Sequence, residues 1–137
     1  APRSVREGPV LSRPADYADA LQRLRQSNAD YVFSAASFGY PIQRALRRLA
    51  GKGTEMFWPE HRETRSQDLE AAYHDAGQFY FGTRDAWLEQ RPFFTPRSLM
   101  HLLPRHRVQD IDTLEDWAHA ERLVEVERLA ASNPIRE

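Results

Sequence analysis

The chain has 137 residues, of which 41% are hydrophobic and 28% charged, a composition typical of a globular protein in water. Lysine and arginine number 19 against 20 acidic residues, and the resulting net charge of -1 gives no electrostatic basis for binding nucleic acid or an anionic membrane. Without cysteine there is no disulfide or thiol chemistry, and without an apolar run near the roughly 18 residues of a membrane span or a signal peptide we expect a cytoplasmic protein.

The first part of the chain predicts one helix and one buried strand. Residues 1–13 are polar and aperiodic, so they are expected to be irregular. A helix should begin at Pro14 and end by Ser27, because apolar residues recur at three- and four-residue steps over 17–24. The run 31–37 is apolar to small and rich in strand formers, which is typical of a buried strand.

The middle of the chain carries weaker signals. Residues 40–49 suit a helix by propensity. Gly51 and Gly53 flank Lys52 in a predicted chain reversal, and a strand over 55–58 should end at Pro59. The following run, 61–70, is polar and is expected to be a loop.

Residues 75–77 predict a turn, and 78–82 a strand with Phe79 and Phe81 on one face and Gln78 and Tyr80 on the other. Thr83 should cap a short helix that buries Ala86, Trp87 and Leu88.

Two further elements follow. A strand is expected over 98–103, and then a helix that ends before Asn133 and leaves 132–137 as a tail. The helix should bury one stripe of side chains, formed by Leu114, Trp117, Ala120, Leu123 and Val124. The alternation of strands and helices predicts an α/β fold. All but two of the aromatic residues lie between Tyr31 and Phe94, which indicates either a dense core or a substrate cleft with a partner interface.

Asp110 and Asp112 form the sequence feature with the clearest chemical potential. In an extended segment, residues two apart point to the same side, so the two carboxylates would converge while Ile111 points into the core. Such a pair suits Mg²⁺, which takes one or two protein carboxylates and fills its shell with water and phosphate. Asp112 or Thr113 would then cap the following helix, and the alternative interpretation is that both aspartates merely form a turn and a cap.

Four sequence motifs support a more specific interpretation: F-S-A-A-S-F-G-Y-P-I-Q-R-A at 33–45, M-F-W-P-E-H at 56–61, Y-H-D-A-G-Q-F-Y at 73–80 and V-Q-D-I-D-T at 108–113. In their order and spacing they resemble the pseudaminic acid cytidylyltransferases, relatives of the CMP-sialic acid synthetases. The resemblance runs from about residue 8 to about residue 123 and is expected to cover the later part of such an enzyme.

This resemblance implies an incomplete Rossmann-like nucleotidyltransferase fold, a three-layer arrangement of a sheet with flanking helices, over 14–131. It also implies that residues 40–70 form an arm used in a homodimer. The reaction would transfer CMP from CTP to a nonulosonic acid and release pyrophosphate. Pseudaminic acid is the favoured acceptor, and legionaminic and sialic acids remain open.

The resemblance assigns Mg²⁺ to Asp110 and Asp112 and the sugar to five other residues. Arg65, or failing it Arg62, would pair with the sugar carboxylate, although a solvated loop explains the same run. Tyr80 would form a pocket wall. Phe93 and Phe94 would line the sugar site or form a core pair, and Gln109 would contact the sugar or a metal-bound water unless it is simply a polar strand residue.

Three basic residues near these motifs invite further roles. His74 beside Asp75 resembles a general base with its partner, but sequence neighbours are seldom partners in space. His106 and Arg107 precede the aspartate pair and could face phosphate or sugar anions, or lie on a solvated strand edge.

A nucleotide-binding loop is not apparent in the sequence. The only lysine is Lys52, in a Gly-Lys-Gly turn without the spacing of a P-loop. We therefore expect either the later segment of an active cytidylyltransferase or a silent module for dimerisation or sugar binding. An unrelated small α/β binding domain is a third, weaker alternative.

Overall fold

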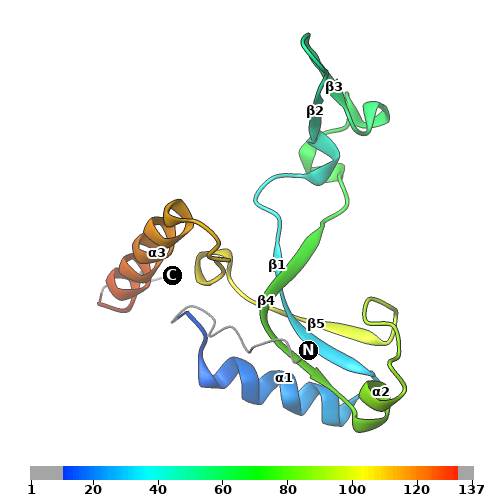
Figure 1. The fold of residues 1–137 in the computed structure, drawn as a ribbon, viewed down its shortest axis with the longest axis vertical. Helices are drawn as coiled ribbons and strands as arrows, with labels where there is room; N and C mark the ends of the chain where they lie inside the picture. The colour runs from blue at the N-terminus through cyan, green and yellow to red at the C-terminus, as the bar shows by residue number, and fades with distance from the viewer. Residues whose placement is uncertain (1–10, 133–137) are drawn as a thin grey trace. The chain divides into compact units, whose positions relative to one another are not determined.

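The structure is a computed structural model that describes residues 11–132 (Figure 1). Two compact units divide these residues. The first comprises the described parts of Ala1–Ala36 and Asp75–Glu137, and the second is Ser37–His74. Each is described here by itself.

The first unit begins with the helix and strand that the sequence predicts. Helix α1 spans Pro14–Gln26 with its proline in the first turn, and strand β1 spans Tyr31–Ser37. Ala20 and Leu24 are the buried residues of α1, which confirms the predicted apolar face. Six of the seven residues of β1 are buried, as expected for a central strand.

The sheet of this unit has the strand order β4-β1-β5, with β4 at Tyr73–Gly82 and β5 at Ser98–Leu102. Strands β1 and β5 are parallel, with Tyr31 opposite Ser98 and Ala35 opposite Leu102. The amide of Thr83, just after β4, donates to the carbonyl of Asp30, just before β1, at 2.9 Å. The end of β4 therefore meets the start of β1, and these two strands are antiparallel.

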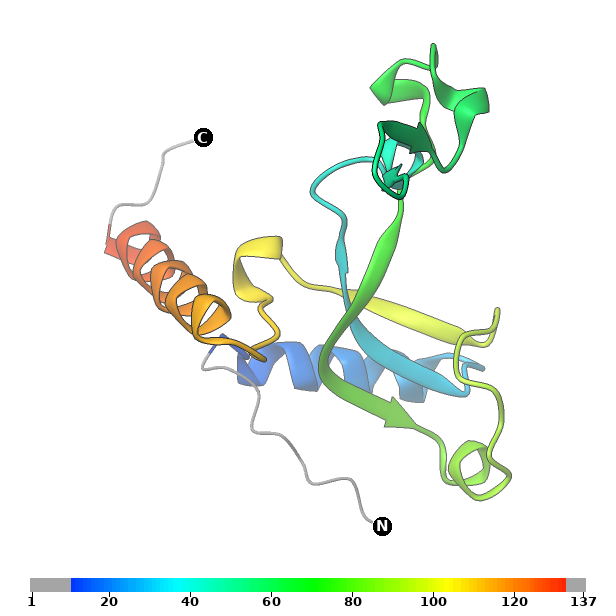
Figure 2. The same cartoon turned by 45° about the horizontal axis from the view of Figure 1, so that its top comes forward.

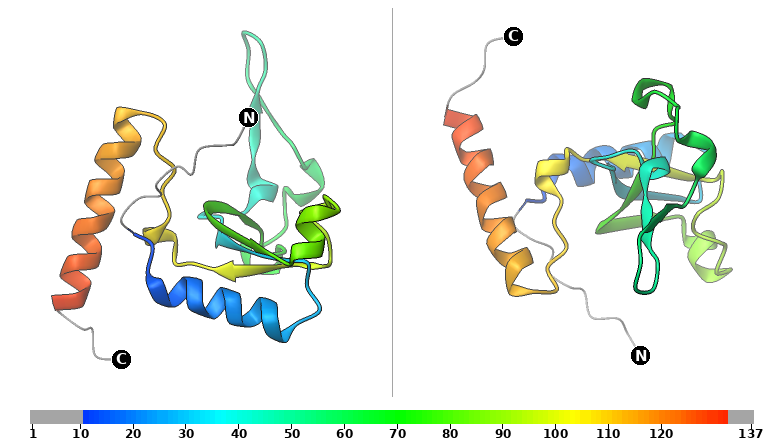
Figure 3. Two further views of the ribbon diagram at one scale, coloured as in Figure 1. Left: turned by 60° about the horizontal axis from the view of Figure 1, so that its bottom comes forward. Right: turned by 90° about the horizontal axis from the view of Figure 1, so that it is seen from above.

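Helix α1 covers one face of this sheet (Figures 2 and 3). The core between them consists of Ala20, Leu24, Ala29, Val32 and Phe79, with Tyr17, Phe81 and Leu99 packed against it. The architecture is a mixed α/β fold with a small sheet, which is the class that the alternation of elements predicts.

Strand β4 corrects one prediction. The expected turn at 75–77 is wrong, because β4 runs through it. The turn chemistry is nevertheless present inside the strand: Gly77 has a φ of 69°, and its N–H donates to the Asp75 carboxylate at 2.8 Å. The hydroxyl of Ser34 on β1 accepts the N–H groups of Gln78 at 3.0 Å and Phe79 at 3.1 Å. A side chain thus replaces part of the strand ladder where β4 bends.

Helix α2, at Arg84–Leu88, is capped as predicted, because the Thr83 hydroxyl accepts the amide of Ala86 at 3.2 Å. Ala86 is buried, but Trp87 and Leu88 are exposed, so their predicted burial is wrong.

Helix α3 spans Leu114–Ser132, and its predicted buried stripe is also wrong. Ala120 is buried, whereas Leu114 is 90% exposed and Trp117 and Val124 are exposed as well. Apolar periodicity marks a face that is able to pack, and whether a partner is present depends on the tertiary structure. None of α1, α2 and α3 combines the length and apolarity that crossing a membrane requires.

The second unit contains an antiparallel pair, β2 at Leu46–Arg48 and β3 at Thr54–Met56. Gly51 and Gly53 both have positive φ in the connecting turn, which confirms the predicted reversal. The stretch 40–49 is not an α-helix, since a single 3₁₀ turn at Ile42–Arg44 precedes β2. The strand expected to reach Trp58 ends at Met56.

Candidate functional site

The two predicted metal ligands lie in residues 109–116, which we call the acidic elbow: an irregular stretch up to Thr113, followed by the first residues of α3. The strand expected over 98–103 is confirmed as β5, but no strand contains Asp110 and Asp112: β5 ends at Leu102, and a 3₁₀ turn at Arg105–Arg107 leads into the elbow. Thr113 caps α3, because its hydroxyl accepts the amide of Asp116 at 3.1 Å. The Asp116 carboxylate in return accepts the amide of Thr113 at 2.9 Å, which completes a capping box.

The carboxylate of Asp116 is committed to this cap. It also accepts the Thr113 hydroxyl at 2.8 Å and the Asp112 amide at 3.2 Å. The hydrogen bond from the Thr113 side chain, followed by those from the backbone of Asp112 and Thr113, lowers the pKa of Asp116. Asp116 therefore holds the backbone of Asp112 in place.

The Gln109 side chain contacts both the elbow backbone and α3. Its amide nitrogen Nε2 donates to the carbonyl of Asp110 at 2.7 Å, and its Oε1 lies 2.6 Å from Nδ1 of His119. Asp110 and Asp112 are both exposed, and Ile111 between them is half-buried. The geometry thus presents two acidic residues to solvent on a segment whose backbone is held from both sides.

Two exposed carboxylates suit Mg²⁺ better than a metal ion whose ligands all come from the protein. Within residues 11–132, no group of three or more His, Cys, Asp or Glu side chains is placed to hold a metal ion. Magnesium needs only one or two carboxylates and completes its shell with water and phosphate oxygens. A Mg²⁺ site at Asp110 and Asp112 stays a prediction.

Both predictions for Arg107 are wrong: it does not face a phosphate or sugar site, and it does not lie on a solvated strand edge. Arg107 is 7% exposed, and its Nη1 donates to the Asp16 carboxylate of α1 at 2.7 Å. Burial by itself would raise the pKa of Asp16, but the hydrogen bonds from Arg107 and His101 outweigh it and lower that pKa. Gln78 of β4 donates to the Arg107 carbonyl at 2.7 Å. The start of the elbow is thereby fixed to α1 and β4.

His106 is also engaged within the protein. Its Nε2 lies 2.5 Å from the carboxylate of Glu127 on α3, and the same carboxylate pairs with Arg13. His106 therefore links the turn at Arg105–Arg107 to α3.

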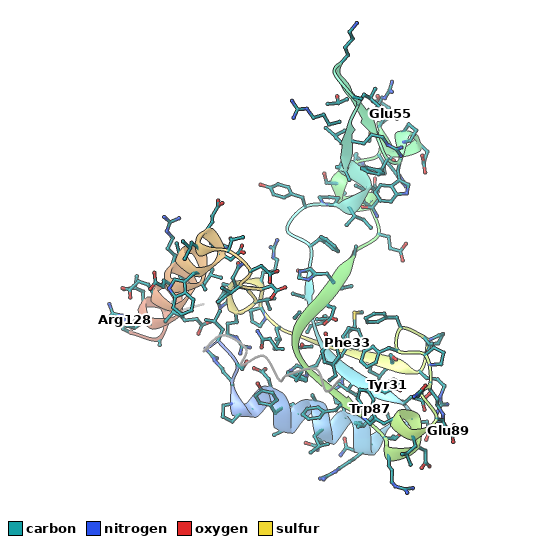
Figure 4. All side chains as sticks on the ribbon, in the orientation of Figure 1. Tyr31, Phe33, Glu55, Trp87, Glu89 and Arg128 are labelled. Carbon is teal, nitrogen blue, oxygen red and sulfur yellow. The ribbon has the colours of Figure 1, made fainter. Side chains whose placement is uncertain are left out.

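A second group of predicted site residues gathers on the face of the sheet opposite α1. The ring of Phe93 lies 4.5 Å from that of Tyr31 and 5.5 Å from that of Phe33, between ring centroids. It also contacts Tyr80 and Phe94, at 5.2 Å each. Phe93 is half-buried, whereas Phe94 is 70% exposed, so only the first behaves as a core residue. Figure 4 labels Tyr31 and Phe33, together with Trp87 of α2, whose ring packs edge-on against Tyr31.

Tyr80 projects from β4 beside this cluster. It is exposed, and its hydroxyl donates to the Asp75 carboxylate at 2.5 Å. Asp75 thus has two bonds within its own strand, one from Tyr80 and one from the amide of Gly77. His74 lies in the second unit, where its ring packs edge-on against Phe38 at 5.1 Å.

Ion pairs that no sequence motif predicts hold the loop carrying Phe93 and Phe94. Asp30 is buried just before β1, and its carboxylate accepts Nε of Arg97 at 2.7 Å and Nη1 of Arg91 at 2.7 Å. One carboxylate thereby holds both ends of the loop. Because 61 and 67 residues separate the partners, no local pattern in the sequence reports this cluster.

This cluster predicts sensitivity to acid. The hydrogen bond from Arg97, helped by Arg91 and opposed by burial, lowers the pKa of Asp30 from 3.8 to about 2. A carboxyl group with a depressed folded-state pKa stabilises the fold above its unfolded-state pKa and loses that contribution as pH falls toward the folded value. The Tm difference between the wild type and Asp30→Asn should therefore be constant above about pH 5 and become smaller as the pH falls from about 4 to about 2. Thermal melts monitored by circular dichroism across this range check this prediction. A Tm difference at pH 2 as large as that above pH 5 would contradict it.

Arg65 belongs to the second unit. Its Nε donates to the Asp68 carboxylate at 2.9 Å, and both side chains are exposed. Arg62, the alternative, is exposed as well. The predicted residues therefore occur in three groups: the acidic elbow, the aromatic cluster and Arg65. The loop that carries Phe93 and Phe94 leads into β5, and the elbow follows β5, so these two groups lie toward opposite ends of that strand (Figures 1 and 2).

A comparison with protein-family models finds no match. Among curated proteins, the chain is 45% identical over 112 residues to the pseudaminic acid cytidylyltransferase of Campylobacter jejuni. That match covers 82% of this chain and 48% of the relative, so the chain spans about half the length of that enzyme.

Two other relatives match shorter stretches. A Helicobacter pylori protein named pseudaminic acid cytidylyltransferase and UDP-2,4-diacetamido-2,4,6-trideoxy-beta-L-altropyranose hydrolase is 39% identical over 87 residues, which are 64% of this chain and 16% of that protein. The N-acylneuraminate cytidylyltransferase of Streptococcus agalactiae is 29% identical over 55 residues, 40% of this chain and 13% of the enzyme. The family resemblance seen in the sequence motifs is confirmed: over 112 residues, this chain is a relative of the pseudaminic acid cytidylyltransferases.

Proposed function

We propose that this chain supplies part of the active site of a cytidylyltransferase that transfers CMP from CTP to a nonulosonic acid, with pseudaminic acid as the favoured acceptor, and releases pyrophosphate. The match to the Campylobacter enzyme carries this proposal. Because it includes 112 of the 137 residues, it must contain residues 26–112, whichever end it starts from. That range holds every residue assigned above to metal or sugar. We further propose that the complete fold is a Rossmann-like nucleotidyltransferase.

Asp110 and Asp112 would hold Mg²⁺, which when bound neutralises negative charge on the phosphates of the nucleotide. The chain's own contribution is to hold the two carboxylates in position. Asp116 and Gln109 hold the backbone of the elbow, and the pair between Arg107 and Asp16 fixes its start. Such preorganisation is the main protein contribution to phosphoryl transfer.

The remaining residues would bind the sugar acid. Arg65 offers a planar guanidinium for the sugar carboxylate. The exposed rings of Tyr80 and Phe94 offer apolar contact for the sugar face, and Phe93 packs against both rings. Gln109 would donate or accept a hydrogen bond at the sugar or at a metal-bound water. The loop that cradles the triphosphate is expected to lie outside these 137 residues.

A homodimer is part of the proposal, and the second unit carries the observation that favours it. An apolar hollow of about 640 Å³ is lined by Phe38, Tyr40, Pro41, Ile42, Arg44, Ala45, Phe57 and Trp58. Several of these large side chains are exposed, including Tyr40 and Phe57. Exposed aromatic surface of this kind is typical of an interface between chains. The alternative function, a silent module for dimerisation or sugar binding, would rest on the same surface.

Calorimetric titration of the chain with MgCl₂ and then with CTP tests the proposal that this chain holds the metal ion while the loop for the triphosphate lies elsewhere. We expect weak Mg²⁺ binding that Asp112→Asn abolishes. With CTP, Mg²⁺ and pseudaminic acid, the chain by itself should form no CMP-sugar. A chimera in which this chain replaces the matched half of the Campylobacter enzyme should form it.

Turnover by the 137-residue chain alone would contradict the expectation that the nucleotide cradle lies elsewhere. A folded chimera without turnover would instead favour the silent module.

A further inference from the structure

The side chain of Gln78, on β4, joins that strand to two other parts of the first unit. Its Nε2 donates to the carbonyl of Arg107 at 2.7 Å, and its Oε1 accepts the hydroxyl of Ser12 at 3.1 Å. Ser12 lies shortly before α1, and Arg107 ends the 3₁₀ turn that leads into the acidic elbow. Both ends of the Gln78 amide are therefore engaged within the protein, which favours a role in holding the chain over contact with a substrate.

The backbone of Gln78 is itself held by the centre of the sheet. Its N–H donates to the hydroxyl of Ser34 at 3.0 Å, and Ser34 is fully buried on β1. The next residue, Phe79, donates its N–H to the same hydroxyl at 3.1 Å and packs in the core against α1. The half-buried side chain of Gln78 thus starts from a fixed point, so the position of its amide is set by the sheet.

The hydrogen bond from Gln78 orients the peptide unit between Arg107 and Val108. On the other side of that unit, the N–H of Val108 donates to the carbonyl of Arg105 at 3.2 Å. Because the atoms of a peptide unit lie in one plane, hydrogen bonds to its C=O and its N–H together fix the direction in which the chain continues. Asp110 follows only two residues after Val108. The hold on this peptide unit is therefore a hold on the path of the elbow.

We propose that Gln78 is a positioning residue for the metal ion: by holding the Arg107 carbonyl, it keeps the elbow in the position from which Asp110 and Asp112 bind Mg²⁺. This inference rests on the proposed function, which assigns the metal to these two aspartates. The ion pair between Arg107 and Asp16 fixes where the elbow starts, whereas Gln78 fixes the direction in which the chain leaves that point. Loss of a group that supports metal ligands in this way typically weakens metal binding by about 10–100-fold.

Two substitutions of Gln78 separate its hydrogen bonds from its size. Gln78→Glu keeps the shape of the side chain and an acceptor for Ser12, but it replaces the donor to Arg107 by a carboxylate oxygen. Gln78→Met keeps the length and removes both hydrogen bonds without adding a charge. The isotope-labelled chain is titrated with MgCl₂ and followed by NMR through the amides of the elbow, at a temperature at which thermal melts show every variant to be folded.

We expect both variants to bind Mg²⁺ at least about tenfold more weakly than the wild type. The added negative charge of Gln78→Glu would by itself strengthen the binding of a cation, so weaker binding identifies the lost hydrogen bond as the cause. Gln22→Glu makes the same change in charge at an exposed position of α1 and should bind Mg²⁺ as the wild type does. Thr83→Ala removes the cap of α2 and should lower the Tm without changing the affinity.

Wild-type affinity for Mg²⁺ in both Gln78 variants would overturn the proposal. An equal loss of affinity in Thr83→Ala would also overturn it, because the effect would then follow from lower stability alone.

Amide hydrogen exchange without metal separates this inference from the proposed function. The amides of Asp112 and Thr113 donate to the Asp116 carboxylate, and we expect them to exchange at least about threefold faster in Gln78→Met than in the wild type. A wild type that binds no Mg²⁺ would count against the proposed function. Faster exchange in Gln78→Met would even then support the hold of Gln78 on the elbow, and unchanged exchange would overturn it.

Discussion

Asp112→Asn should lower kcat of the active chimera at least about 100-fold while its Tm stays unchanged. The amide keeps the size of the carboxylate but removes the charge that Mg²⁺ requires. A 100-fold loss corresponds to about 2.7 kcal/mol of transition-state stabilisation, which is within the several kcal/mol that a catalytic metal supplies. Asp112 is exposed, and asparagine keeps the backbone amide that donates to Asp116, so the cap of α3 should be retained. Steady-state kinetics with CTP and pseudaminic acid, together with thermal melts, measure both effects.

Asp19→Asn is the matched control for this prediction. Asp19 is exposed on α1, and the substitution makes the same change in charge outside the elbow, so turnover should remain at the wild-type level. Asp110→Asn should resemble Asp112→Asn. If Asp112→Asn keeps wild-type turnover, the elbow is not the metal site.

Phe79→Ala should cost about 3–5 kcal/mol of the free energy of unfolding, the usual range for removing a buried phenylalanine ring. The ring joins β4 to α1: it lies 5.0 Å from the ring of Tyr17 and 5.3 Å from that of Phe81. A domain of this size has only about 5–15 kcal/mol to lose. Urea denaturation followed by circular dichroism should therefore show a midpoint far below that of the wild type.

Leu129→Ala provides the comparison, because that side chain is exposed on α3 and its loss should change stability by about 0.5 kcal/mol or less. Phe79→Leu, which keeps most of the buried volume, should be the milder of the two core variants. A Phe79→Ala protein as stable as Leu129→Ala would show that the core does not lie between α1 and the sheet.

Features that depend on near neighbours in the chain follow from local sequence patterns. Pro14 and the apolar spacing after it define α1, and the continuous apolar run defines β1. Thr83 caps the helix that follows it, and Gly51 reverses the chain. Each of these follows from dihedral preferences or from hydrogen bonds that span three or four residues.

Long motifs also indicated the family, because a run of many residues carries far more information than the two aspartates of the elbow. The resemblance also predicted the site residues, and those assignments stay predictions for the experiments above to test.

Ion pairs and burial that involve residues far apart in the sequence depend on the tertiary structure. The pair between Arg107 and Asp16 joins residues 91 positions apart, and Asp30 binds Arg91 and Arg97 across 61 and 67 positions. The stripe of α3 had the spacing of a buried face, yet Leu114 is exposed. Local patterns state what a residue is able to bury or pair with. Whether it does so depends on which partner the fold brings within a few ångströms, and that is a property of the whole chain.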